Sequence, residues 1–164
     1  MEYINQLIMS YKPKGLLVDT NLLLLYFIGA YDPERISRFK RTMAFTIDEF
    51  LLLAMFLGLF EKIITTPNIL TEVSNLSGQL PENLRAFFWE DFAGRMLDLQ
   101  ESYTPSTTIS ASPHFTKFGL TDSGIVGLVK DKYLVLTDDL KLAAYLQNLD
   151  IDVINFNHIR AIAW

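Results

Sequence analysis

Four acidic residues of this 164-residue chain stand where apolar segments end or where helices are predicted to begin: Asp19, Glu72, Asp122 and Asp139. The first ends an apolar strand predicted at 15–19, and the last follows a second strong strand predicted at 133–137. Glu72 lies about two turns beyond a short strand predicted at 63–65. Asp122 opens the helix that precedes 133–137, and Thr121 is predicted to cap that helix at its start. Chemistry that uses several carboxylates together is therefore the first function to consider.

The carboxyl ends of parallel strands lie on one edge of a sheet, so side chains at these positions can converge. Asp122 joins them only if its helix also begins on that side. Converged carboxylates repel one another unless a cation joins them. Oxygen ligands without Cys or nearby His suit Mg²⁺ or Mn²⁺, and the chain has no Cys and two His. One or two such ions could activate water and offset charge on a phosphodiester during cleavage.

Each acid also has a simpler explanation. Asp19 can cap the helix that follows it, and Asp122 and Asp139 gain from the positive end of a helix dipole with or without a metal. Asp138 could be the cap of its helix, which would leave Asp139 free. Glu72 could be an ordinary exposed helix residue. Taken together, these alternatives describe a catalytically inactive binding or scaffold module in which the acids are helix caps.

The elements that would position the acids alternate along the chain. Strands are predicted at 15–19, 63–65, 133–137 and 151–154, with helices between them. The unbroken apolar run before Asp19 is typical of a strand buried on both faces. This alternation predicts right-handed crossovers and an α/β, three-layer sandwich, in which helices cover both faces of a mostly parallel sheet. The length fits a single domain over 1–164.

Two further segments could bind a partner. A helix predicted to open at Asp32-Pro33-Glu34 carries four cations, which form either a solvated basic face or a local contact to RNA phosphates: Arg35, Arg38, Lys40 and Arg41. Thr46 and Glu49 match a capping box, and the helix they open is expected to run to about 61 or 62. Its segment 50–60 is apolar nearly all round, so it is either buried in the domain or packed on a partner.

Two predicted segments separate the second strand from the third. A longer helix is expected over about 81–99, with aromatic residues at core-facing spacing. The stretch 101–115 is rich in Ser, Thr and Pro and lacks periodicity, so it is predicted to be a loop, either a lid or a linker.

Composition excludes several classes of function. The net charge of −5 argues against a simple phosphate-binding module but not against an enzyme whose acids hold metal ions. No Gly-x-Gly-x-x-Gly follows the first strand, and neither a Gly-Lys-Ser/Thr loop nor a Gly-x-Ser-x-Gly elbow occurs. The longest uncharged apolar run, 50–60, is shorter than the ~20 residues of a membrane span. Residues 1–11 lack the basic start of a signal peptide. We expect no membrane association and a cytoplasmic location.

Four segments, read in order, resemble the acidic motifs of PIN-domain ribonucleases: 16–21, 66–73, 120–123 and 135–139. The resemblance implies an α/β sandwich and Mg²⁺- or Mn²⁺-dependent cleavage of RNA. It implies that Asp19, Glu72, Asp122 and Asp139 are the metal-site acids. The last acid of the family usually stands two residues after a Ser or Thr, which selects Asp139 over Asp138.

The resemblance also implies a set of neighbours and partners. Asn21 and Thr137 match polar positions that commonly line the pocket in the family, and Asp138, next to Thr137, is expected to line it as well. Many small PIN proteins are toxins of toxin–antitoxin pairs, which are dimeric and inhibited by a partner. An RNA substrate, a cognate antitoxin protein and a homodimer are therefore expectations that come from the resemblance.

Overall fold

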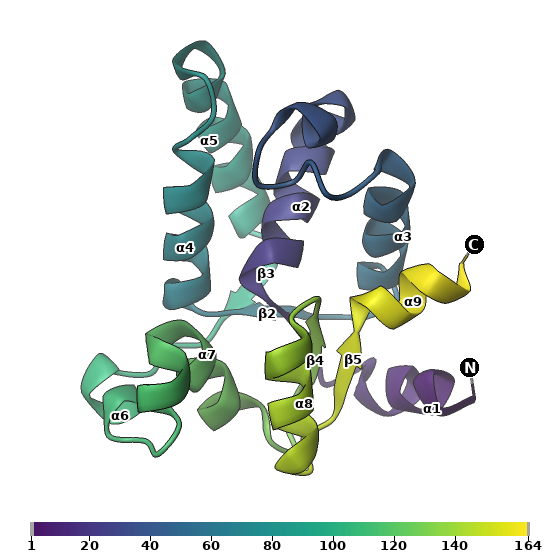
Figure 1. Cartoon of the computed structure of the whole chain (residues 1–164), viewed down its shortest axis with the longest axis vertical. Coiled ribbons are helices and arrows are strands. Elements are labelled where there is room, and N and C mark those ends of the chain that lie inside the picture. Colours follow the sequence, from purple (N-terminus) through teal and green to yellow (C-terminus); the bar gives the residue numbers. More distant parts are fainter. Residues whose placement is uncertain (1, 164) are drawn as a thin grey trace.

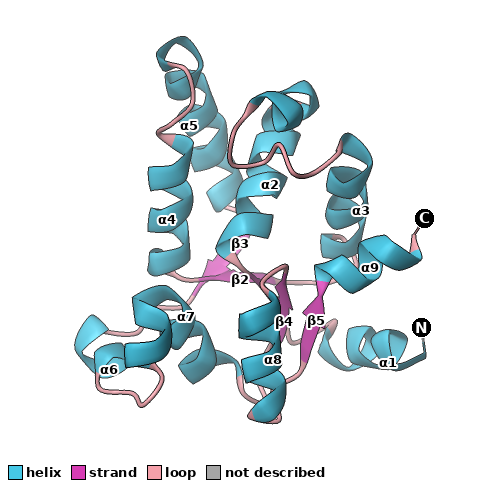
Figure 2. Ribbon diagram, in the orientation of Figure 1, coloured by secondary structure: helices cyan, strands magenta, loops and turns pink. Residues whose placement is uncertain are grey.

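Five short strands form one sheet in the order β3-β2-β1-β4-β5, and every neighbouring pair is parallel. The computed structural model describes residues 2–163. Helices lie on both sides of the strands, which confirms the predicted three-layer α/β sandwich (Figures 1 and 2). The strands are β1 (Leu16–Val18), β2 (Ile63–Thr65), β3 (Leu99–Glu101), β4 (Leu134–Thr137) and β5 (Val153–Asn155).

The helices of the described residues alternate with these strands. In Figure 1, α2 to α5 lie above the sheet, and α6 to α8 lie below it. Their bounds are α1 (Glu2–Tyr11), α2 (Thr20–Tyr31), the 3-10 helix η1 (Pro33–Arg38), α3 (Ile47–Leu57), α4 (Pro67–Ser77), α5 (Glu82–Met96), α6 (Ser106–Ser110), α7 (Phe115–Val129), α8 (Leu140–Asn148) and α9 (Phe156–Ile162). None of these helices is long and apolar enough to cross a membrane.

The central strand β1 is buried on both faces, as its unbroken apolar run predicts. Leu16 pairs with Ile63 on one side and with Leu134 on the other. Gly15 precedes this strand with φ +130°, and a Cβ there would lie 2.9 Å from the Ile64 side chain. Only glycine therefore allows β1 and β2 to begin side by side at this point.

The direction of strand succession reverses at β1. From β1 the chain adds β2 and β3 on one side, and it then returns to add β4 and β5 on the other. Open parallel sheets bind ligands in the crevice outside the carboxyl ends of the strands at such a reversal. The crevice lies between the ends of β1 and β4, and both predicted acidic segments, 19–21 and 137–139, follow those strands directly.

The region 97–115 differs from its prediction. The helix expected over 81–99 ends at Met96, and the strand β3 follows it. The segment expected to be a loop over 101–115 contains the short helix α6. β3 is an edge strand whose residues are half-buried or exposed, so no apolar run marks it. Its strand conformation comes from pairing with β2, which a local pattern does not record.

Three predicted helix boundaries are also corrected. The basic segment after Asp32 forms the 3-10 helix η1 and then turns, instead of a helix that reaches 41. The capping box of Thr46 and Glu49 is confirmed, but α3 ends at Leu57. The helix predicted to begin at Thr121 begins earlier, at Phe115, and bends at Gly119, whose φ is +75°.

Candidate functional site

The four predicted acids line one pocket at the reversal point of the sheet. Its volume is about 180 Å³, and its wall is made of Asp19, Thr20, Asn21, Glu72, Leu76, Asp122, Asp139 and Leu142. The acids come from four different elements: the start of α2, the middle of α4, α7 and the start of α8. We call this the acidic pocket. The helix that carries Asp122 does reach the same side of the sheet.

Asp19 is the best-fixed member of the acidic pocket. It is 6 % exposed and caps α2, where its Oδ1 accepts a hydrogen bond from Leu22 N at 3.1 Å. Its Oδ2 accepts from the Thr137 hydroxyl and from Asp138 N, the latter at 3.1 Å. These donors come from both strand ends beside the reversal, so they fix the carboxylate between β1 and β4.

Burial, reinforced by the neighbouring charge of Asp138, raises the pKa of Asp19 to about 8. The hydrogen bonds from Thr137, Leu22 and Asp138 act in the opposite direction but do not offset the burial. An ionised Asp19 is therefore costly in the protein alone. A cation beside it would lower that cost.

Asp122 is the second carboxylate with a perturbed pKa. Burial, reinforced by the charges of Asp139 and Glu72, raises its pKa to about 6. Both of these neighbouring acids line the same pocket as Asp122. No hydrogen bond to its carboxylate is found among residues 2–163.

Glu72 is held by hydroxyl groups from two other helices. Thr20 of α2 donates to its Oε2 at 3.0 Å, and Thr121 of α7 donates to its Oε1 at 2.5 Å. The Thr121 hydroxyl is therefore used across the pocket, and not as the helix cap that the sequence suggested. Neither contact was predicted, although each threonine directly adjoins a predicted acid, Asp19 or Asp122.

Asp139 both lines the pocket and caps α8. Its Oδ1 accepts from Lys141 N at 2.8 Å and from Leu142 N at 3.0 Å. The alternative in which Asp138 caps this helix and leaves Asp139 free is wrong. Asp139 N donates to the Thr137 hydroxyl oxygen at 3.0 Å. Thr137, which was predicted to line the pocket, is not in its lining but makes hydrogen bonds to both Asp19 and Asp139.

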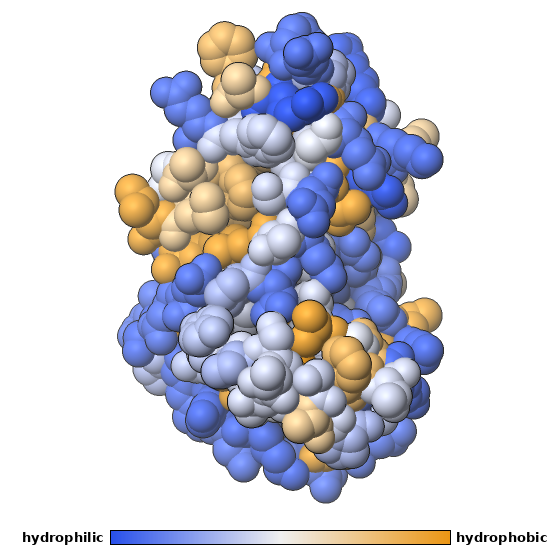
Figure 3. Space-filling view, turned by 90° about the vertical axis from the view of Figure 1, so that its left-hand side faces the viewer, coloured by the Kyte–Doolittle hydropathy of each residue, from blue (hydrophilic) through white to orange (hydrophobic). Residues whose placement is uncertain are grey.

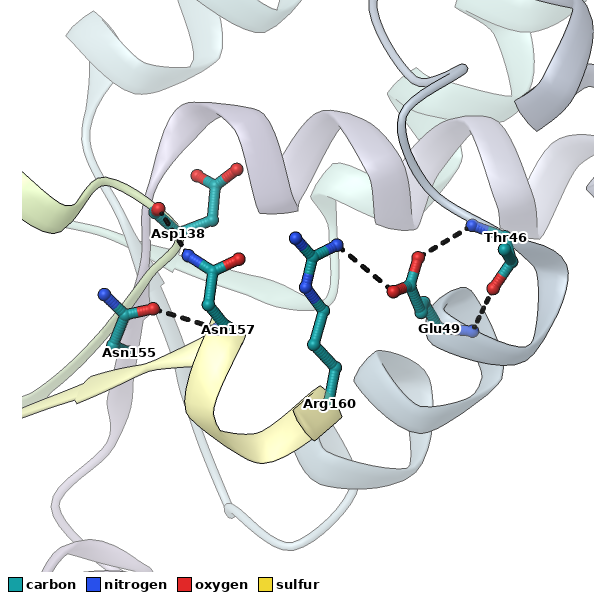
Figure 4. A network of polar contacts seen from close by, with 6 residues as sticks. All are labelled: Thr46, Glu49, Asp138, Asn155, Asn157 and Arg160. Carbon is teal, nitrogen blue, oxygen red and sulfur yellow. Dashed lines mark hydrogen bonds and ion pairs between the residues drawn. The ribbon is translucent and has the colours of Figure 1, made fainter. Parts of the chain in front are cut away.

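Of the other two predicted pocket residues, Asn21 lines the acidic pocket and Asp138 does not. Asn21 Nδ2 lies 3.4 Å from Asp138 Oδ1, and Asn157 Nδ2 donates to the Asp138 carbonyl at 2.9 Å. Figure 4 shows how α9 supports this turn: Asn155 caps the helix that carries Asn157. The two asparagines were not predicted, and only their position after a strand could have indicated them.

The same close view shows how α9 is tied to the rest of the domain. Arg160 donates to Glu49 Oε1 at 3.1 Å, and Glu49 also closes the capping box with Thr46 (Figure 4). Arg160 and Glu49 are both partly buried, so the pair is better shielded than a surface ion pair. The contact secures α9, and through Asn157 it steadies the turn after β4.

None of the four predicted RNA-contact cations, Arg35, Arg38, Lys40 and Arg41, lines the acidic pocket. Arg35 Nε lies 4.0 Å from Asp32 Oδ2, and Arg41 donates to Gln79 Oε1 at 3.0 Å. Arg38 and Lys40 are exposed on η1 and the turn after it. An RNA contact through these residues stays a prediction.

The acidic pocket has the donor chemistry for a hard divalent cation but is not arranged as a finished coordination cluster. Among residues 2–163, no group of three or more His, Cys, Asp or Glu side chains is placed to hold a metal ion. Glu72 is engaged by two hydroxyls, and Asp19 and Asp139 hold backbone amides. Asp19 Oδ2 and Asp139 Oδ1 each accept two hydrogen bonds, but Asp19 Oδ1, Asp139 Oδ2 and both Glu72 oxygens keep free lone pairs. These oxygens and the Asp122 carboxylate are the kind of ligand that Mg²⁺ or Mn²⁺ takes.

Comparisons of the chain with protein-family models, curated proteins and solved structures find no match. The resemblance to PIN-domain ribonucleases therefore rests on the ordered motifs and on the pocket that those motifs line.

Proposed function

We propose that this chain is a Mg²⁺- or Mn²⁺-dependent endoribonuclease of the PIN type. The observation that supports this proposal most strongly is the acidic pocket, where carboxylates from four elements meet at the reversal point of a parallel sheet. Two of these carboxylates, Asp19 and Asp122, have raised pKa values, because burial and neighbouring acids disfavour their charge. Perturbed acids that converge in a cleft are typical of functional sites.

Asp19 and Asp122 would be the principal ligands of the cation, with Glu72 and Asp139 completing its oxygen shell. When bound, a divalent cation activates water and offsets charge on the phosphodiester. Asp19 contributes a position fixed by three hydrogen bonds, so its oxygens need little reorganisation. Glu72 and Asp139 are exposed at the pocket and can accept hydrogen bonds from the attacking water. Thr137 orients both Asp19 and Asp139.

One observation favours the alternative, an inactive binding or scaffold module. Asp19 and Asp139 do cap α2 and α8, so part of the acid pattern has a structural role in any case. This alternative predicts that Mg²⁺ and Mn²⁺ leave the melting temperature unchanged and that Asp122→Asn has little effect on that result.

Cleavage of a fluorescent single-stranded RNA by the purified chain with Mn²⁺ tests the proposal. Asp122→Asn should abolish cleavage, and Asp19→Asn should lower it by at least about 100-fold, the scale of removing a preorganised electrostatic group. Asp48→Asn is the matched control, because Asp48 is also an acid in a first helical turn but is exposed on α3. Cleavage that survives Asp122→Asn unchanged would show that the acidic pocket is not the site.

The antitoxin and the homodimer belong to this proposal through the resemblance, and the cytoplasmic location belongs to it through the composition of the chain. Expression of the chain in cells, compared with Asp19→Asn, tests the toxin role: only the parent chain should arrest growth. Equal growth of both strains, with cleavage shown in vitro, would argue for a nuclease that is not a toxin.

A further inference from the structure

A larger groove adjoins the acidic pocket. Its volume is about 490 Å³, within the ~300–1,000 Å³ of ordinary ligand pockets. Glu72 lines both the groove and the acidic pocket, so the two adjoin at this side chain. The groove runs from α4 to the segment before α6 and to the bend of α7. Figure 3 faces this side of the molecule, where pale side chains of intermediate hydropathy gather in the lower half.

Three aromatic side chains line this groove: Tyr103, Phe115 and Phe118. We call it the aromatic groove. Its remaining wall consists mainly of hydroxyl, amide and small side chains, including Thr71 and Ser106, and Glu72 is the only charged residue in its lining. The lining contains no Lys or Arg that could pair with a phosphate. It does offer ring faces and neutral hydrogen-bonding groups, which suit a nucleobase.

The rings differ in how firmly they are held. Phe118 packs against Tyr145 with ring centroids 4.6 Å apart, and the Lys117 and Lys141 ammonium groups lie 5.4 and 5.8 Å from its centroid. Tyr103 is 75 % exposed and takes part in none of the ring–ring contacts found among residues 2–163. Phe118 is therefore a packed side chain in the wall of the groove, whereas the ring of Tyr103 is exposed and can stack on a ligand.

The bend of α7 forms part of the groove wall. Gly119, at the bend, lines the groove with φ +75°, and a Cβ there would meet no atom within 4 Å. The two lysines beside Phe118 place positive charge at that end, where the phosphates of a bound strand could pass.

We propose that the aromatic groove is a stacking subsite for an unpaired base of single-stranded RNA whose backbone continues into the acidic pocket. The inference rests on the proposed nuclease function for its choice of ligand. Stacking on Tyr103 would tolerate any base, since every base has a π-face. The chain would then bind single-stranded RNA close to the cleavage site without reading its sequence through base-edge hydrogen bonds.

The test measures RNA binding separately from cleavage. The full chain with Asp122→Asn is titrated into a short single-stranded oligoribonucleotide that carries one 2-aminopurine, and both anisotropy and base quenching are followed. Tyr103→Ala should weaken binding about five- to a hundred-fold, the range of one base–aromatic stack, and should remove the quenching. Tyr103→Phe should keep the affinity within about twofold, because the ring is retained.

Tyr3→Ala is the matched control, because Tyr3 is an exposed tyrosine (62 %) on the distant helix α1. The subsite would be overturned if Tyr3→Ala weakened RNA binding as much as Tyr103→Ala does, or if Tyr103→Ala did not weaken RNA binding at all. RNA cleavage is also measured in the chain whose four pocket acids are intact. If Tyr103→Ala in that chain leaves the KM for RNA unchanged, the subsite is overturned and the nuclease proposal stands. Binding that depends on Tyr103 without any cleavage would overturn the nuclease and leave the subsite. Tight binding of a peptide together with no measurable binding of RNA would overturn the subsite.

Discussion

The replacement Asp19→Asn should change how the stability of the metal-free protein depends on pH. The folded-state pKa of Asp19 is about 8, raised by burial and by Asp138, whereas its ordinary value is 3.8. The folded state therefore binds more protons than the unfolded state between about pH 4 and pH 8. The stabilisation that protonated Asp19 contributes is fully present below its pKa in the unfolded state. It is lost as the pH rises through its pKa in the folded state.

The size of the effect follows from the pKa difference. Each pH unit between the two pKa values changes the free energy of unfolding by about 1.4 kcal/mol. Asp19 is nearly buried, so little screening by solvent reduces this value. Between pH 5 and pH 7 the parent chain should lose on the order of 3 kcal/mol through this group alone.

The variant adds a cost that does not depend on pH. The two carboxylate oxygens of Asp19 accept from Leu22 N, Asp138 N and the Thr137 hydroxyl. An amide has one acceptor oxygen, so one backbone N–H loses its partner at a cost of about 1–3 kcal/mol. Asp19→Asn should be less stable than the parent at pH 5, and the difference should shrink or change sign by pH 8.

Urea unfolding followed by circular dichroism in EDTA, from pH 5 to pH 8, measures this difference. Asp48→Asn controls for the loss of one negative charge at an exposed helix start. A difference between Asp19→Asn and the parent that stays constant across the pH range would refute the reasoning, because it would mean that Asp19 is ionised at every pH tested.

Three further outcomes are expected. At pH 8, Mn²⁺ at about 100 times its Kd should stabilise the parent by about 2.7 kcal/mol, and Asp122→Asn should remove most of that shift in thermal unfolding. Gly29→Ala should cost about 1–3 kcal/mol in urea unfolding, because the added Cβ would overlap the Phe50 ring; unchanged stability would show that Phe50 can move aside. Tyr11→Phe should cost about 1–2 kcal/mol by removing the 2.7 Å hydrogen bond to Asp152. Burial and that bond raise the pKa of Tyr11 to about 12, so the parent should lose stability between pH 10 and pH 12 and the variant should not.

The central part of the fold could be predicted because its determinants are local. β1 and β4 are unbroken apolar runs buried on both faces, and the cap of α3 lies within four residues. β3 could not be predicted, because its partner β2 lies more than thirty residues away and its own residues carry no apolar pattern. The first part of α7 was also missed, because the helix was predicted to begin at Thr121, beyond Gly119, whose positive φ interrupts the helical backbone.

The sequence predicted which acids line the acidic pocket, but it did not predict the hydrogen bonds that hold them. Acids at the ends of parallel strands share an edge, so the positions of Asp19 and Asp139 follow from topology. The hydroxyls that hold Glu72 come from Thr20 and Thr121, which lie 52 and 49 residues away. Such contacts depend on how α2, α4 and α7 pack together, and no spacing along the chain records that packing.

Capping and metal binding do not exclude each other, because a cap occupies only part of a carboxylate. Asp19 and Asp139 therefore fit both the nuclease and the scaffold proposals. Asp122 fits only one of them: it caps no helix, accepts no hydrogen bond found among residues 2–163, and lies half-buried beside the charges of Glu72 and Asp139. An unpaired carboxylate in that position costs folding free energy that a scaffold does not need. A cation would offset this cost, so Asp122 separates the two proposals more sharply than Asp19 does.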